Sequence, residues 1–199
     1  MVYLYAIQIV ENQYDDEIVS LFAKISEERR KKAKKYTRRI DPKRCILGEV
    51  LLRYILWKHY GITSKEIVFR YNEYGKPLLT KPKGIHFSIS HSGEWVLCGV
   101  SDTPIGIDVE GGMVDVAEIA ERFFSEEENR YIDSQLLCNR YDAFYKIWTL
   151  KESYIKCVGM GLYIPLDSFY NEIVKFILRY RNKKGKDIVE KRYQRFRKY

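Results

Sequence analysis

Residues 85–110 read IHFSISHSGEWVLCGVSDTPIGIDVE and contain three short apolar segments separated by turn residues. Apolar residues alternate with polar ones over 85–90, which is the period of a half-buried β-strand, and the mainly apolar run over 95–101 also predicts a strand. Gly93 supplies the turn between these two segments. The alternation resumes over 105–110, so we expect a further strand there. These segments predict a sheet near the middle of the chain.

Helical patterns flank this sheet on both sides. Apolar residues recur three or four positions apart in several segments, as on the buried face of a helix. Helices mixed with short strands indicate the α+β class. The predicted helices are 15–39 (restarting at Ser26 and breaking near Asp41-Pro42), 44–60, 116–124, 125–137 and 142–158. Ser125 and Glu128 form a capping box at the start of the fourth of these. The further strands are 1–10, 67–71 and 77–79, joined by a turn over 72–75, and 166–178.

The composition is that of a globular protein. Of 199 residues, 46% are hydrophobic and 15% aromatic, which excludes a disordered or fibrous chain. No apolar run reaches the roughly 20 residues of a membrane helix, and the first ten residues lack a secretory leader. We therefore expect a cytoplasmic protein with no membrane partner. The chain has four cysteines, Cys45, Cys98, Cys138 and Cys157. They form no Cys-x-x-Cys pair, which argues against a disulfide framework or a zinc site.

Charge is distributed unevenly along the chain. The formal net charge is +8, from 35 Lys+Arg and 27 Asp+Glu. Residues 24–44 and 171–199 each carry 11 basic and 3 acidic side chains, whereas residues 108–133 carry 9 acidic and 2 basic ones. Basic patches attract polyanions such as nucleic acid, phospholipid or a phosphorylated small molecule. The alternative interpretation is a solvated helix face.

Two carboxylates stand two residues apart in Gly106-Ile-Asp-Val-Glu110. In a strand, Asp108 and Glu110 would share one face while Ile107 and Val109 share the other. Two anions on one face repel unless a cation lies between them. Hard oxygen ligands suit Mg²⁺, which often completes its coordination with phosphate oxygens. The alternative is a pair of ordinary exposed acids.

A third carboxylate and a histidine complete the candidate chemistry. Helical spacing places Trp148, Glu152 and Lys156 on one helix face. Glu152 and Lys156 could instead form a simple surface ion pair. His91 lies where a strand enters the Gly93 turn, and a purely structural histidine is the alternative there.

Together these segments resemble the 4'-phosphopantetheinyl transferases, specifically the surfactin-synthetase-activating (Sfp-like) type. The motifs that carry the resemblance are FSISHSGEWV, PIGIDVE, ERFFSEEE and WTLKESYIKCVGMGLYIPLDSF, in that order. The resemblance implies two similar α+β halves related by a pseudo-twofold, with coenzyme A in the cleft between them. The halves would be residues 1–104 and 105–199, the second carrying the metal site and a basic tail from about residue 179.

The resemblance also implies roles for individual residues. The family uses Mg²⁺ and binds coenzyme A through its phosphates. Arg29 stands where lysine is often found, which exchanges a point charge for a fork of donors. The implied metal ligands are Asp108, Glu110 and Glu152; the implied coenzyme A residues are Arg29, Lys32, Arg44, Lys76, Ser90, His91 and Lys156; the implied catalytic residues are Glu152, as general base, with Lys156 and His91.

The implied reaction moves phosphopantetheine from coenzyme A to a serine of an apo acyl or peptidyl carrier protein, and it releases 3',5'-ADP. Nonribosomal peptide or antibiotic synthesis is the first expected context. An acidic carrier protein would dock on residues 159–190, whose net charge is positive, with a contribution from Arg122, Phe123 and Phe124. The two phenylalanines could equally pack into the core.

The resemblance ends near Phe169, where the chain continues into a basic stretch lacking strand alternation. The family usually adds further strands here. An altered C-terminus leaves open a weak or inactive family member. Two other classes stay open as alternatives: a basic nucleic-acid-binding module, which would leave the three carboxylates unused, and a carrier-protein binder without catalysis.

Overall fold

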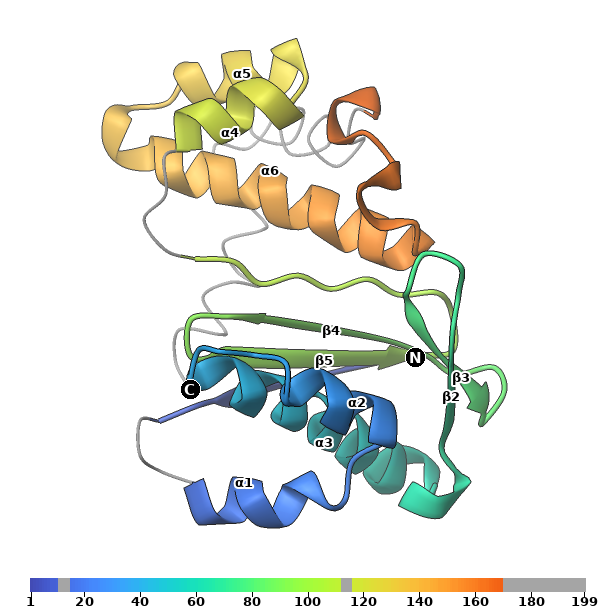
Figure 1. Cartoon of the computed structure of the whole chain (residues 1–199). Coiled ribbons are helices and arrows are strands. Elements are labelled where there is room, and N and C mark those ends of the chain that lie inside the picture. The colour runs from blue at the N-terminus through green and yellow to red at the C-terminus, as the bar shows by residue number, and fades with distance from the viewer. Residues whose placement is uncertain (11–14, 112–115, 170–199) are drawn as a thin grey trace. The chain divides into compact units, whose positions relative to one another are not determined.

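The computed structural model describes residues 1–10, 15–111 and 116–169 (Figure 1). The chain divides into two compact units, residues 1–115 with 151–164 and residues 116–150 with 165–199. This division differs from the expected boundary at residue 104, because the segment that follows residue 104 and residues 151–164 belong to the first unit.

A three-stranded antiparallel sheet organises the first unit (Figure 1). Its order is β1 (Val2–Gln8), β5 (Trp95–Ser101) and β4 (His86–Ser92), with Phe87 opposite Val100. The two strands predicted over 85–90 and 95–101 are confirmed as β4 and β5. Consecutive residues are buried in both strands, Phe87 and Ser88 in β4 and residues 98–101 in β5, so both faces of the strands are covered.

Helix α3 (Ile40–Tyr60) packs on this sheet and buries Leu52, Ile55 and Leu56 completely. Helices α1 (Asp15–Phe22) and α2 (Glu27–Ala33) contact α3 in turn (Figure 1). The predicted break near Asp41-Pro42 is wrong. Pro42 lies in the first turn of α3, where its missing N–H has no intrahelical partner to lose, so the interruption falls before α3.

A separate two-stranded hairpin follows α3. The short 3₁₀ helix η1 (Ser64–Glu66) leads into β2 (Val68–Tyr71), which pairs with β3 (Pro77–Lys81). The Asn72 side chain accepts hydrogen bonds from the backbone N–H groups of Tyr74 and Lys76, which closes the predicted turn.

The predicted strand over residues 105–110 is wrong. The contacts that replace strand pairing there also position Asp108 and Glu110. The described backbone there joins no ladder. Instead, the Ile107 N–H donates to the Ser88 hydroxyl at 3.1 Å and the Val109 N–H donates to the Ser90 hydroxyl at 3.3 Å. Serine side chains of β4 thus replace the carbonyls of a neighbouring strand. The segment lies against side chains of the sheet rather than along its backbone.

The second unit is helical in its described part. Helices α4 (Val116–Phe123), α5 (Glu126–Asp133) and α6 (Leu137–Val158, assigned to this unit as far as Leu150) share one apolar core. The predicted Ser125–Glu128 capping box begins α5 and is confirmed. The core residues are Ala120, Phe124, Ile132, Ala143, Phe144 and Ile147.

After α6 the chain forms two 3₁₀ turns, η2 (Gly161–Tyr163) and η3 (Leu166–Ser168). The strand expected over 166–178 begins as η3, and residues 170–178 lie outside the described residues. The α+β class is confirmed by the mixture of sheet and helices, while the pseudo-twofold stays a prediction. Within the described residues, no helix combines the length and apolar character needed to cross a membrane.

Candidate active site

One cavity of about 420 Å³ lies in the first unit, a volume within the usual range for small-molecule sites. Phe87 and Ile89 of β4 form part of its apolar wall. Its polar lining is mostly cationic and comes from segments far apart in the sequence. The lysine, arginine, histidine and glutamate residues that line it are Arg29, Lys32, Arg44, Lys76, His91, Glu152 and Lys156. The cavity therefore gathers six of the seven predicted coenzyme A residues.

Helices α2 and α3 supply three of these cations. Arg29 and Lys32 are three residues apart on α2, so they share a helix face. From α3, Arg44 donates through Nε to the Gly93 carbonyl at 2.8 Å and through Nη1 to Asp41 Oδ1 at 2.8 Å. These bonds hold the Arg44 guanidinium at the turn that follows His91.

Lys76 and the end of α6 are joined by hydrogen bonds. Lys76 Nζ donates to the Cys157 carbonyl at 2.8 Å, and Asn72 Nδ2 donates to the Gly159 carbonyl at 2.8 Å. Gly159 ends the helix with a φ of 87°, a conformation that favours glycine. Desolvation lowers the pKa of the Lys76 ammonium. The ammonium has three donors, so it can contact an anion in the cavity as well.

Asp108 forms the centre of the acidic cluster, and its side chain is fully buried. Its Oδ1 accepts a 2.7 Å bond from the Ser90 hydroxyl and a very short bond from the Lys156 ammonium. Its Oδ2 has no hydrogen-bond partner in the described structure, an unusual state for a buried oxygen. Lys156 Nζ is also 4.0 Å from Glu152 Oε2, so one ammonium balances two carboxylates.

The nearby negative charge also affects the pKa values of the other two predicted metal ligands, Glu110 and Glu152. Desolvation and the Asp108 charge raise the pKa of Glu110, against a 3.1 Å bond from the Ser92 hydroxyl. Desolvation also raises the pKa of Glu152, where Lys156 opposes the shift and Asp108 adds to it. Unmet negative charge and an unpartnered carboxylate oxygen fit a hard divalent cation such as Mg²⁺.

The acidic side chains do not converge on a common centre in this structure. Among the described residues, no three His, Cys, Asp or Glu side chains are grouped closely enough to hold a metal ion. The Lys156 ammonium lies between Asp108 and Glu152 and acts as the local cation. The carboxylate oxygens are therefore suitable ligands for Mg²⁺, and in this structure the Lys156 ammonium supplies the positive charge beside them.

His91 lies beside the cationic wall. Desolvation by the wall, followed by the positive charges of Arg44 and Lys156, lowers the pKa of its imidazole. The ring is therefore mostly neutral near pH 7 until an anion favours its protonated form.

Some functional side chains were missed from the sequence. Ser88 and Ser92 both contact the segment that carries Asp108 and Glu110: Ser88 binds the Ile107 N–H and Ser92 binds the Glu110 carboxylate. The available signal was the alternation of serines in the FSISHS motif, which places them on one strand face. The pattern did not show what would lie against that face.

The predicted carrier-docking residues have mixed outcomes. Phe124 is only 4% exposed and packs against Phe144, so its assignment to a docking surface is wrong. Removing an apolar ring from water is favourable, so Phe124 is more stable in this core than on the surface. Phe123 is half-buried and Arg122 is exposed over its ring. Of the docking stretch 159–190, residues 170–190 lie outside the described residues.

Two family models match this sequence, and both belong to one superfamily. The model described as "4'-phosphopantetheinyl transferase, N-terminal" matches residues 12–102. The model described as "4'-phosphopantetheinyl transferase superfamily" matches residues 104–195. The matches together extend over most of the chain.

Individual proteins show the same similarity. The 4'-phosphopantetheinyl transferase gsp of Aneurinibacillus migulanus is 41% identical over 81% of this chain and 68% of its own length. The 4'-phosphopantetheinyl transferase Sfp of Bacillus subtilis is 42% identical over 73% of this chain and 65% of its own length. A crystal structure of a Bacillus anthracis holo-(acyl-carrier-protein) synthase with CoA (3',5'-ADP) is 20% identical, with a TM-score of 0.40, and covers 50% of this chain and 91% of that one.

Proposed function

The chain belongs to the 4'-phosphopantetheinyl transferases, and from this premise we propose that it transfers the 4'-phosphopantetheine of coenzyme A to a serine of an apo carrier protein, releasing 3',5'-ADP. The observation that carries the proposal is a cavity whose cationic wall meets an acidic cluster in one unit. Coenzyme A offers three phosphates to the cations, and its diphosphate brings the reacting phosphorus to the carboxylates.

Coenzyme A would bind along the cationic wall. Arg29 and Lys32 of α2 would contact the 3'-phosphate, and Arg44 would contact it or the neighbouring diphosphate. Lys76, His91 and the Ser90 hydroxyl would contact the diphosphate. Support for this placement is that the cations line one cavity, and that bonds to protein groups hold Arg44 and Lys76 in place.

Asp108, Glu110 and Glu152 would hold Mg²⁺, supported by the unpartnered Asp108 oxygen and the raised pKa values of the two glutamates. When bound there, Mg²⁺ supplies positive charge that neutralises the diphosphate. Lys156, already beside Asp108 and Glu152, would donate to a phosphate oxygen. These are the groups that stabilise a phosphoryl-transfer transition state.

The bond changes follow from this arrangement. The carrier serine oxygen forms a bond to the β-phosphorus of coenzyme A, and the bond from that phosphorus to the oxygen of 3',5'-ADP breaks. Glu152 is our candidate to accept the serine proton, because its carboxylate lines the cavity where the diphosphate would lie. Lys156 and His91 would donate hydrogen bonds to the phosphate oxygens as charge develops there.

The carrier protein would dock on the described part of the stretch that follows α6. Leu162 and Tyr163 of η2 are 68% and 76% exposed, so they offer apolar contact area. On the second unit, the exposed Arg122 stays a separate predicted contact, whose charge would suit an acidic carrier. Peptidyl carriers of a secondary-metabolite pathway are the first candidates, and the cytoplasmic location stays a prediction.

The test is intact-mass spectrometry of an apo peptidyl carrier protein incubated with this protein, coenzyme A and Mg²⁺. We expect the carrier to gain one phosphopantetheine group, and we expect EDTA to abolish the gain while added Mg²⁺ restores it. A carrier whose serine is replaced by alanine is the control. An unchanged carrier mass, with folded enzyme, would contradict the proposed activity.

Binding of the diphosphate is expected to strengthen as the pH falls from 8 to 6. The lowered pKa keeps His91 neutral in the free protein, and a bound anion raises it, so binding takes up a proton. Calorimetric titration with 3'-dephospho-coenzyme A avoids the phosphomonoester, whose own pKa is about 6. We expect a gain of about threefold. If the affinity of His91→Asn changed with pH as much as that of wild type, this role for His91 would be contradicted.

A further inference from the structure

We propose that Glu49 is a positioning residue for the cation that reads the 3'-phosphate: its buried carboxylate fixes Arg29 and the start of α2 at the cavity wall. This inference rests on the proposed function and adds a residue that touches no part of coenzyme A. Glu49 belongs to α3 and is 1% exposed.

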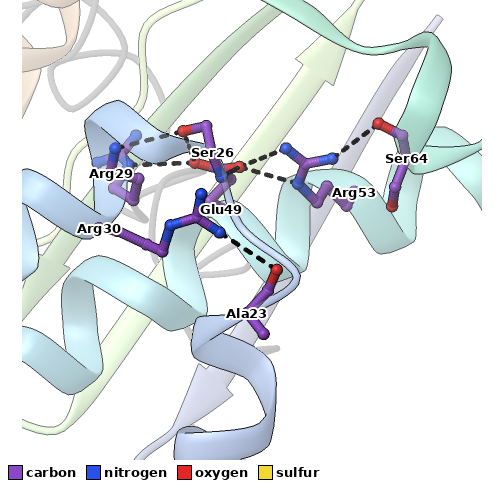
Figure 2. Close-up of polar contacts among 7 residues, drawn as sticks. All are labelled: Ala23, Ser26, Arg29, Arg30, Glu49, Arg53 and Ser64. Carbon is purple, nitrogen blue, oxygen red and sulfur yellow. Dashed lines mark hydrogen bonds and ion pairs between the residues drawn. The ribbon is translucent and has the colours of Figure 1, made fainter.

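The Glu49 carboxylate joins groups from two sides (Figure 2). On one side, Arg53 donates to Oε1 through Nε at 2.8 Å and Nη2 at 2.6 Å. On the other, the Ser26 N–H donates to Oε1 at 2.7 Å and the Ser26 hydroxyl donates to Oε2 at 2.7 Å. Arg29 Nε lies 3.6 Å from Oε2. Such charge-assisted contacts define geometry as well as energy.

Through Ser26 the carboxylate also places the backbone of α2. Ser26 is the N-cap of α2, and its hydroxyl accepts from the Arg29 N–H at 3.3 Å. The same hydroxyl donates to Glu49, so one oxygen links the helix start to α3. Because α2 carries both Arg29 and Lys32, a shift at Ser26 would move both cations of the cavity wall.

The guanidinium of Arg29 suits this arrangement. Its Nε faces Glu49, while the Arg29 side chain lines the cavity. A planar fork can contact an internal carboxylate with one edge and a phosphate with another, which a lysine ammonium cannot do in a fixed orientation. Figure 2 shows Arg29 and Arg53 reaching Glu49 from opposite sides.

The direction in which Glu49→Gln changes coenzyme A affinity distinguishes two roles for Glu49: positioning Arg29 or only neutralising its charge. If Glu49 only weakened Arg29 by neutralising its charge, Glu49→Gln would raise the local positive charge and tighten coenzyme A binding. If Glu49 positions Arg29, the same substitution weakens coenzyme A binding because the fork loses its anchor. The 3'-phosphate is the probe, because 3'-dephospho-coenzyme A differs from coenzyme A by this group alone.

The experiment is calorimetric titration of the full chain with coenzyme A and with 3'-dephospho-coenzyme A, in wild type and in Glu49→Gln. We expect the preference for coenzyme A to fall about fivefold to tenfold, since a charge-assisted contact is worth roughly that factor. Affinity for the dephospho form should change less than twofold. An unchanged or increased preference, in a variant that melts as a folded protein, would overturn the proposal.

Arg53→Gln is the matched control. It removes a partner of the same carboxylate, and it leaves the Ser26 and Arg29 contacts in place. We expect it to lower the melting temperature yet keep the wild-type preference for coenzyme A. In an Arg29→Gln background, Glu49→Gln should add no further loss of preference. An equal loss of preference in Arg53→Gln would show a general packing defect and overturn the positioning role.

A folding failure of Glu49→Gln would not end the test. Ser26→Ala removes the hydroxyl link and retains the backbone bond to Glu49, so the preference should fall in the same direction by a smaller factor. If Ser26→Ala kept the full preference, the proposal would fail. A wild-type protein that binds neither form of coenzyme A would instead refute the proposed function itself.

Discussion

Replacing Asp108 by asparagine is expected to lower phosphopantetheine transfer by about 1,000-fold or more, because loss of a metal-binding or charge-stabilising group in phosphoryl transfer has effects of that size. The measurement is the initial rate of carrier mass gain with saturating coenzyme A and Mg²⁺. Asparagine keeps the shape of the side chain, so the protein should remain folded.

The expected loss follows from the position of Asp108. Its buried carboxylate accepts from both Ser90 and Lys156, and its second oxygen is unpartnered in the described structure. An amide in its place carries no charge, so its oxygen would hold a divalent cation and the Lys156 ammonium far more weakly than the carboxylate does. Lys156 is partly exposed and also lies 4.0 Å from Glu152, so its charge would not be left buried and unpaired, and the loss should be chemical rather than structural.

Asp102→Asn provides the matched control. Asp102 is an exposed carboxylate that accepts from the N-terminal ammonium at 2.7 Å, and it does not line the cavity. Its replacement should leave transfer within about twofold of wild type, as expected for an exposed ion pair. Wild-type turnover by Asp108→Asn would refute the assignment of the metal site.

Replacing Gly106 by alanine is expected to destabilise the first unit by at least about 3 kcal/mol, the upper end of the usual cost of overpacking. A Cβ at Gly106 would lie 1.8 Å from the Ser153 carbonyl oxygen and 2.5 Å from the Cys157 nitrogen. Both atoms belong to the α6 backbone, which cannot yield as a flexible side chain can. The segment that carries Asp108 would have to move away from the helix that carries Glu152.

Thermal unfolding followed by circular dichroism measures this effect. For a chain of this size we expect the melting temperature to fall by roughly 6 to 12 °C. Transfer should also be lost at temperatures where the variant is still folded, because the carboxylates separate. Gly111→Ala is the control, since a Cβ there would meet nothing within 4 Å. Equal melting temperatures for wild type and Gly106→Ala would contradict this close packing.

Much of this protein could be predicted from local patterns. Short apolar patterns predicted β4 and β5, and the Ser125–Glu128 spacing predicted the start of α5, because each depends on neighbours within a few residues. The order of motifs indicated the transferase family, which the comparisons confirm. The resemblance also implied which cations bind coenzyme A, and the fold gathers them in one cavity, although no local pattern shows that Arg29, Lys76 and Lys156 lie together.

Other features depended on contacts between distant segments. Residues 105–110 alternate like a strand, but the Ser88 and Ser90 hydroxyls bind their backbone, so no ladder forms. From the sequence, Phe124 could equally be a surface residue or a core residue. Its contact with Phe144 shows that it belongs to the core.

The sequence by itself determined the class of the fold, the principal strands and helices, the family and the residue types of the site, because periodicity and motif order are local properties. The tertiary structure alone decided which groups meet. It placed Lys156 between Asp108 and Glu152, and it buried Glu49 against Ser26 and Arg29. The physical reason is that a period assigns a residue to a face of its own element, whereas its partners are set by the packing of elements far apart in the chain.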